Sequence, residues 1–218
     1  MGIITRSVAN NITTSGVILP AGINDASVAS ITGLAQVSAG DGITLISSQT
    51  ASASASLSFT TGIDSTYRTY LFKFINLHPS ENGSVLQFNF STDGGSNYNV
   101  TKTSTTFFAQ HDEANTDTSL SYYASQDLAQ STASQNIAGN IASDNDSGST
   151  GYMYLFNPSD TTYVKHFIGI NSYMDTYSYT LQMYFGGYAN TTSAINAFRI
   201  KMNTGNIDAG TILMYGIA

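Results

Sequence analysis

The sequence predicts an all-β protein: a β-sandwich or jelly roll of about ten antiparallel strands, preceded by an extended N-terminal arm. Apolar and polar residues alternate with a period of two in many short runs, which is the pattern of a strand with one buried face. Clusters of Gly, Asn, Asp and Pro separate these runs, and no stretch has a convincing amphipathic helical pattern. Evenly spaced strands without intervening helices favour packed antiparallel sheets over a βαβ fold.

Residues 1–55 are predicted to form the arm. The first 58 residues contain only three charged side chains, Arg6, Asp25 and Asp41, and no aromatic residue precedes Phe59. A solvated disordered tail usually carries more charge, and a self-sufficient domain needs larger side chains for its core. We therefore expect the arm to be ordered by packing on a partner, with a flexible leader as the alternative.

Residues 56–218 are predicted to form the sandwich. The run from Ala53 to Phe59 alternates with serines, and similar alternation marks residues 86–90, 179–185 and 195–202. Residues 91–96 carry the Asp-Gly-Gly signal of a hairpin turn. Residues 119–142 could support a short helix, and residues 143–151 indicate a solvated loop. Four stretches are apolar on both faces, which predicts strands covered on both sides: residues 67–77, 152–156, 163–173 and 211–217.

The composition excludes several classes of protein. Charged residues make up 10% of the 218 residues, and the formal net charge is −7 with only seven Lys and Arg. A chain with so few basic side chains does not neutralise a phosphate backbone, so we expect no nucleic-acid binding. The sequence has no cysteine, which excludes disulfides and cysteine-ligated metals. It also has no apolar run of roughly 18 residues, so no membrane insertion is expected.

No motif in the sequence indicates catalysis, and we expect neither enzymatic activity nor a cofactor. Glu81 and Glu113 are the only glutamates, and both lie among polar loop residues, which indicates surface charges. His78 and His111 lack the helical i, i+4 spacing of a zinc site.

One acidic loop has a superficial likeness to a calcium site. Asp144 and Asp146 place carboxylates at alternate positions, but Ser149 stands where the sixth position of an EF-hand loop requires glycine. An acidic turn is the favoured interpretation, and a loosely held cation stays open.

The most informative feature is the aromatic content of 14 Tyr and 11 Phe. Most of these rings are expected in the core. Tyr173, Tyr177 and Tyr179 lie in a predicted hairpin tip, and exposed tyrosines are common at protein interfaces. We therefore take these three residues as candidates for contact with a receptor. The alternative is that their rings pack against neighbouring strands.

The low charge also bears on assembly. Burying a charge at an interface costs several kcal/mol unless it is paired, so the cores of protein interfaces are poor in Lys, Glu and Asp. A chain rich in Ser, Thr, Asn and Tyr but poor in charge is typical of a surface that contacts protein. We therefore expect a homo-oligomer, and specifically a homotrimer.

Several segments resemble a group of tailed-bacteriophage virion proteins. In that group an F-S-T-D-G-G-S-x-Y hairpin follows two apolar strands, and the chain closes with G-T-I-x-L-Y-G-I. Here Met214 intervenes before the closing Tyr-Gly-Ile. Residues 12–22 are similar to the leaders of phage fibre and appendage proteins. The resemblance is carried by residues 63–70, 75–79, 91–98, 155–159 and 209–217.

The resemblance implies a non-enzymatic structural protein of the virion, in a tail fibre or in a head- or tail-attached appendage. It further implies a trimer whose N-terminal arm, residues 1–55, binds other virion proteins, and whose β-domain faces outward, where a host-surface glycan is a possible ligand. A free carbohydrate-binding module is the main alternative. A polysaccharide-degrading enzyme is less favoured, because the chain lacks the repeat of a long β-helix.

Overall fold

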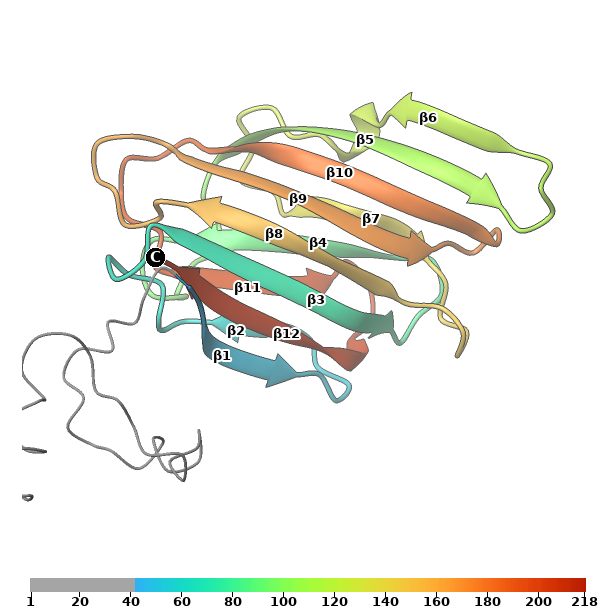
Figure 1. Cartoon of the computed structure of the whole chain (residues 1–218), viewed down its shortest axis with the longest axis horizontal. Coiled ribbons are helices and arrows are strands. Elements are labelled where there is room, and N and C mark those ends of the chain that lie inside the picture. Colours follow the sequence, from blue (N-terminus) through green and yellow to red (C-terminus); the bar gives the residue numbers. More distant parts are fainter. Residues whose placement is uncertain (1–41) are drawn as a thin grey trace, which may run out of the picture. The chain divides into compact units, whose positions relative to one another are not determined.

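The computed structural model describes residues 42–218, so the predicted arm up to residue 41 lies outside the described residues. The described part is a sandwich of two antiparallel sheets, which confirms the predicted fold class. Figure 1 shows the larger sheet in front of the smaller one. The strands are β1 (Ile43–Thr50), β2 (Leu57–Phe59), β3 (Thr69–Pro79), β4 (Ser84–Ser91), β5 (Lys102–Asp112), β6 (Thr118–Tyr122), β7 (Gln135–Ile141), β8 (Ser149–Phe156), β9 (Lys165–Met174), β10 (Tyr179–Ala189), β11 (Ala197–Met202) and β12 (Ile207–Ile217).

The two sheets differ in size. The larger sheet has eight strands in the order β1-β12-β3-β8-β9-β10-β5-β6, and the smaller has four in the order β2-β11-β4-β7. β8, β9 and β10 are joined by consecutive hairpins at the centre of the larger sheet, and β1 and β6 are its edges.

The core lies between the sheets and is built largely from phenylalanine. Phe198 on β11 stacks on Phe72 of β3 with the ring centroids 4.2 Å apart. Phe88 on β4 meets Phe167 of β9 edge to face at 5.3 Å. These contacts join the two sheets, because each pair takes one ring from each sheet.

The sandwich begins earlier than the sequence predicts. β1, which lies within the predicted arm, pairs with β12 from Ile43 opposite Ile217 to Thr50 opposite Thr211. Residues 43–55 therefore belong to the sandwich and not to an arm. The strand was missed because it is rich in Ser and Thr and, as an edge strand, has little apolar surface to bury.

Two further expectations change. Residues 119–142 contain no α-helix: they hold β6, a single 3-10 turn (Ala124–Gln126) and β7. The four stretches that are apolar on both faces lie in β3, β8, β9 and β12, where the smaller sheet covers only one face. Their second apolar face is therefore left on the surface of the described domain.

Candidate contact surface

The outer face, defined here as the side of the eight-stranded sheet turned away from the smaller sheet, is apolar. Its side chains come from nearly every strand of the sheet, and many belong to large apolar residues that are substantially exposed. The exposed large apolar residues on this face are Ile43, Leu45, Ile75, Phe107, Leu120, Tyr122, Tyr152, Phe156 and Ile168.

The strand register gathers the aromatic rings into rows across the sheet. Phe107, Tyr184, Ile170 and Tyr152 lie opposite one another on β5, β10, β9 and β8. The rings of Phe107 and Tyr184 are stacked, with centroids 4.7 Å apart and an interplanar angle of 3°. Cross-strand pairs of this kind stabilise a sheet, and here they also form a flat apolar platform.

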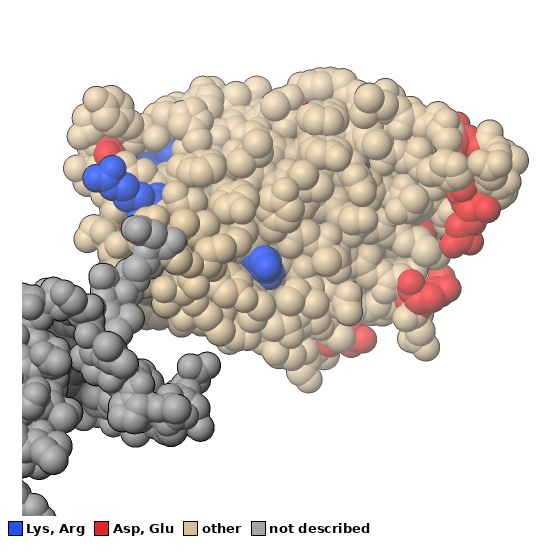
Figure 2. Space-filling view, viewed as in Figure 1, with Lys and Arg blue, Asp and Glu red and all other residues tan. Residues whose placement is uncertain are grey.

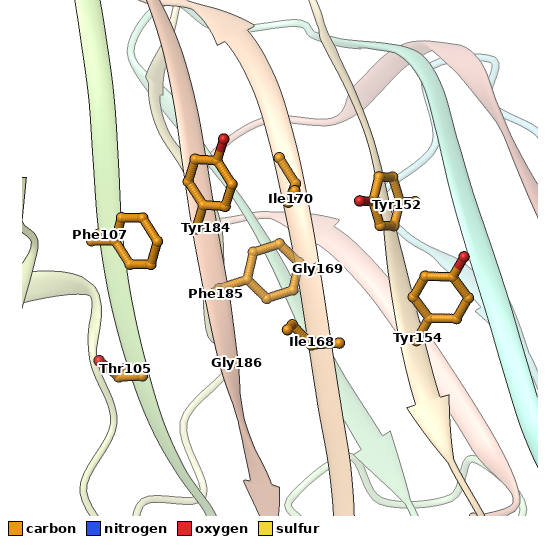
Figure 3. Close-up of a pocket in the computed structure, with 10 residues that line it drawn as sticks. All are labelled: Thr105, Phe107, Tyr152, Tyr154, Ile168, Gly169, Ile170, Tyr184, Phe185 and Gly186. Atoms are coloured by element: carbon orange, nitrogen blue, oxygen red, sulfur yellow. The ribbon is translucent and has the colours of Figure 1, made fainter. Parts of the chain in front are cut away.

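The adjacent row contains a glycine, which opens a groove. Thr105, Gly186, Ile168 and Tyr154 lie opposite one another, next to the first row. A Cβ added to Gly186 would find its nearest atom 3.5 Å away, so the hollow exists because this position has no side chain. The two rows line a groove of about 400 Å³, shown in Figure 3.

A second glycine, on the inner side of the sheet below the groove, makes room for a core side chain. A Cβ on Gly169 of β9 would lie 2.3 Å from Cζ of Phe185, whose ring occupies that space. Phe185 is buried in the core, whereas its neighbours Tyr184 and Gly186 face outward. Successive residues of β10 point to opposite faces of the sheet. The strand therefore contributes Phe185 to the core and Tyr184 and Gly186 to the groove.

The outer face carries almost no charge. Among the eight strands, Lys73 on β3 is the one Lys or Arg at an outer-face position, and its Nζ lies 5.8 Å from the centroid of the Tyr215 ring. Lys102 and Lys165 lie on the same sheet but are fully buried. Figure 2 shows this face as a broad uncharged area with one basic side chain near its middle.

Acidic residues gather instead at one end of the sandwich, in and beside the loops β3–β4, β5–β6, β7–β8 and β9–β10. Figure 2 shows them as a red margin at the right. These four loops contain no Lys or Arg. The carboxylates at this end are those of Glu81, Asp112, Glu113, Asp117, Asp144, Asp146, Asp175 and Asp208.

The three tyrosines predicted to contact a receptor do not form one patch. Tyr173 is 3% exposed, and its buried hydroxyl has no hydrogen-bond partner among the described residues, so the expectation that it lies on the surface is wrong. The alternation of β9 turns it toward the core, where burial raises the pKa of its hydroxyl.

The other two tyrosines flank the β9–β10 turn. Tyr177 is 74% exposed at the tip, where its backbone N–H and that of Tyr179 donate to the carboxylate of Asp175. Tyr179 is partly buried, and its hydroxyl donates to Asp117 at 3.1 Å, which raises the pKa of the hydroxyl. Tyr177 is therefore the tyrosine of this set that projects freely into solvent. Its role as a receptor contact stays a prediction.

Two of the residues considered as metal ligands, His78 on β3 and Asp144 in the β7–β8 loop, contact each other. Nε2 of His78 lies 3.1 Å from the carbonyl oxygen of Asp144, and Nδ1 lies 3.9 Å from the carboxylate of Asp208. The loop after Asp144 is a turn closed by the backbone N–H of Ser147. Within residues 42–218, no three His, Asp or Glu side chains are grouped so that they could hold a metal ion.

The groove residues were missed as a site although their pattern was visible in the sequence. Residues 152–156 and 163–173 are apolar at successive positions, a pattern that predicts a strand covered on both faces. The same pattern describes a strand whose second face is an exposed contact surface, and only the strand order distinguishes the two cases.

Comparison with protein-family models, curated proteins and solved structures found no match to this chain. None of the helices in the described residues has the length and apolar character needed to cross a bilayer.

Proposed function

We propose that the protein is a non-enzymatic structural component of a tailed-phage particle, a fibre or appendage protein anchored by the residues that precede β1. The observation that carries the proposal is the outer face, which is large, aromatic and nearly free of charge. Contiguous apolar surfaces of this kind are uncommon on free monomers and mark contacts with other proteins.

The segments that resemble phage virion proteins support the proposal, because they build the fold. After β4, the carboxylate of Asp93 accepts hydrogen bonds from Ser91 Oγ and from the backbone and side chain of Asn97. These bonds lower the pKa of Asp93 to about 2. The guanidinium of Arg199 lies over the ring of Tyr98 at 4.1 Å. The closing segment forms β12, which pairs with both β1 and β3.

The location of the protein tests the proposal. An antibody against the sandwich should label one defined structure on purified particles in electron micrographs, and peptides of the chain should be found in those particles by mass spectrometry. Absence of the chain from purified particles would contradict the proposal.

Contact with the host is tested separately at the exposed turn. Replacing Tyr177 with alanine should reduce adsorption of particles to host cells, because Tyr177 is the freely projecting ring of the tip. Tyr163→Ala is the matched control, because Tyr163 is equally exposed but lies in the β8–β9 loop. Equal adsorption of the two variants would contradict the prediction that Tyr177 contacts a receptor.

A carbohydrate-binding module is the second candidate, and the stacked Phe107–Tyr184 platform favours it, since flat aromatic surfaces stack on sugar rings. The groove offers few polar partners for sugar hydroxyls beyond Thr105 and the tyrosine hydroxyls. A glycan array should then show saturable binding that Tyr184→Ala abolishes. If no glycan binds, the carbohydrate-binding module is contradicted, and the structural role is the one candidate that stays.

A further inference from the structure

The smaller sheet has a solvent side of its own, turned away from the larger sheet, and this side is polar. Five polar residues on it are partly exposed, whereas the two neighbours of each along its strand are buried, so the alternation of the strands directs all five to the same side. We call them the polar face: Ser58 on β2, Arg199 and Lys201 on β11, Gln87 on β4 and Asn136 on β7.

The strand register arranges the polar face in two rows. Lys201, Gln87 and Asn136 lie opposite one another on β11, β4 and β7. Arg199 lies opposite Ser58 of β2 in the next row. Neighbouring strands are about 4.8 Å apart and alternate residues of a strand about 7 Å apart, so the two rows cover a patch about 10 Å long and 7 Å wide. A short oligosaccharide can lie across both rows.

Hydrogen bonds between amides hold the first row in place. Gln87 Nε2 donates to Asn136 Oδ1 at 2.6 Å, and Asn136 Nδ2 donates to Gln126 Oε1. These bonds fix the orientation of the Gln87 amide and leave its Oε1 as an acceptor beside Lys201. A ligand hydroxyl can donate to this oxygen without the cost of ordering the side chain, because the side chain is already ordered.

Arg199 and Lys201 bring positive charge that the described residues do not neutralise. Residues 42–218 contain six Lys and Arg, of which Lys102 and Lys165 are buried, and two of the other four stand at successive outward positions of β11. The strands of the smaller sheet contain no Asp or Glu, and neither cation pairs with a carboxylate of the described residues. In a chain of net charge −7, two adjacent cations without partners indicate an anionic ligand.

The guanidinium of Arg199 is already positioned for such a ligand. It lies 4.1 Å from the centroid of the Tyr98 ring, and this cation–π contact restricts where the group can move. The contact does not consume the N–H donors of the guanidinium as an ion pair would. They stay available for the two oxygens of a carboxylate, which a guanidinium binds through paired hydrogen bonds.

We propose that the polar face binds an acidic polysaccharide, a polymer whose sugar rings carry both carboxylates and hydroxyls. Arg199 and Lys201 bind the carboxylates, and Gln87 binds a hydroxyl. A nucleic acid fits less well, because its affinity depends on neutralising many phosphates and the patch offers two cations. The inference rests on the proposed function only for the source of the polysaccharide, which is then the host surface.

The first test compares two probes that differ in the carboxylate, with binding to the full-length chain measured by isothermal titration calorimetry. A galacturonic acid oligomer should bind saturably. A galactose oligomer of the same length should bind about tenfold more weakly, because the charge-assisted hydrogen bonds are lost. The affinity for the acidic oligomer should fall as NaCl is raised. Equal affinity for the two probes, or no saturable binding of the acidic one, overturns the inference.

Substitutions locate the ligand on the molecule. Lys201→Gln and Arg199→Gln should each weaken binding of the galacturonic acid oligomer about tenfold. Lys73→Gln is the matched control, because it removes an exposed cation from the larger sheet, and it should change the affinity less than about twofold. Unchanged affinity in both the Lys201 and the Arg199 variants overturns the inference.

The amide is tested in the same way. Gln87→Ala should weaken binding about fivefold, since it removes the acceptor for a ligand hydroxyl. Gln182→Ala, which removes an exposed amide on β10, is its control and should leave the affinity unchanged. Thermal unfolding and near-UV circular dichroism check that each variant is folded. Equal affinities of these two variants overturn the role of Gln87.

Two other results overturn the inference by identifying a different site or ligand. Glycan binding that Tyr184→Ala abolishes and Lys201→Gln leaves unchanged takes place in the groove and not on the polar face. Tighter binding of a single-stranded DNA oligomer than of the galacturonic acid oligomer shows that the patch recognises phosphates. Failure of the proposed function is distinct from both. A chain that binds the acidic oligomer but is absent from particles overturns only the virion role, and a chain in particles that does not bind it overturns only the polar face.

Discussion

Lys102 shows how one buried charge affects the stability of this fold. Its side chain is fully buried, and its Nζ donates to Asn89 Oδ1 at 2.6 Å and to the carbonyl oxygen of Val100 at 2.7 Å. No carboxylate in the described residues forms an ion pair with it. Burial therefore lowers the pKa of Lys102 to about 7, since the uncharged amine is easier to desolvate.

This shift predicts a pH dependence of stability. Between pH 7 and 10.5 the unfolded chain binds the Lys102 proton while the folded chain has lost it, so the free energy of unfolding rises with pH. The gain from pH 7 to pH 9 should be about 2 kcal/mol in urea unfolding. Lys102→Met should remove that gain, whereas Lys201→Met, a control on β11, should keep it. An equal gain in both variants would contradict this origin.

Two glycines of the groove should differ in how much stability they lose when a methyl group is added. Gly169→Ala places a Cβ 2.3 Å from Phe185 Cζ and 2.5 Å from the carbonyl oxygen of Tyr152, so the core or backbone must shift. We expect a loss of about 1–3 kcal/mol in the free energy of unfolding. Gly186→Ala meets no atom closer than 3.5 Å and should change stability by less than about 0.5 kcal/mol. Similar losses at both positions would contradict the assigned faces.

At the scale of elements, the sequence predicts those strands whose apolar residues face the core. In β10, Leu181, Met183 and Phe185 are buried as their alternation with polar residues indicates. β5 was not predicted because its pattern is inverted: Thr106 faces inward and Phe107 outward. The buried hydroxyl of Thr106 donates to the Tyr123 carbonyl and to the Asp127 carboxylate. Because these partners lie outside the strand, the local pattern does not show that a threonine can face the core here.

The same reasoning explains why the candidate site was only partly predictable. Tyr177 was correctly placed at a hairpin tip, because the turn between β9 and β10 has a local signal. The groove depends on which strands are neighbours, and β5 pairs with β10 across about 70 residues of chain. Local pattern does not determine such a pairing.

The position of β1 in the sheet predicts the outcome of two truncations. Removing residues 1–41 leaves all the strands of the described sandwich in place, so we expect the free energy of unfolding to stay unchanged. Removing residues 1–50 also deletes β1 and exposes the edge of β12. This longer truncation should lose roughly 2–4 kcal/mol, because a full set of ladder hydrogen bonds is broken. Equal stability of the two forms would show that β1 contributes little.

At the scale of the whole molecule, the distribution of charge predicts how association responds to salt. A contact between apolar surfaces is little affected by screening, whereas excluded salts such as sulfate strengthen it. If the chain self-associates through the outer face, as the predicted homotrimer requires, its dissociation constant should change less than threefold between roughly 50 and 500 mM NaCl, and it should fall in ammonium sulfate. Steep weakening by NaCl in sedimentation experiments would indicate ion pairs that the outer face does not contain.

The pairing of the first and last strands has a practical consequence for engineering. Ile43 lies opposite Ile217, so the polypeptide enters and leaves the sandwich at the same pole. The turn that carries Tyr177 lies at the other pole, beside the acidic loops (Figure 1). A fluorescent protein fused to the C-terminus would crowd the entry point. A short epitope inserted at the Tyr177 turn would be displayed some 30 Å away, about the length of a strand in this sheet.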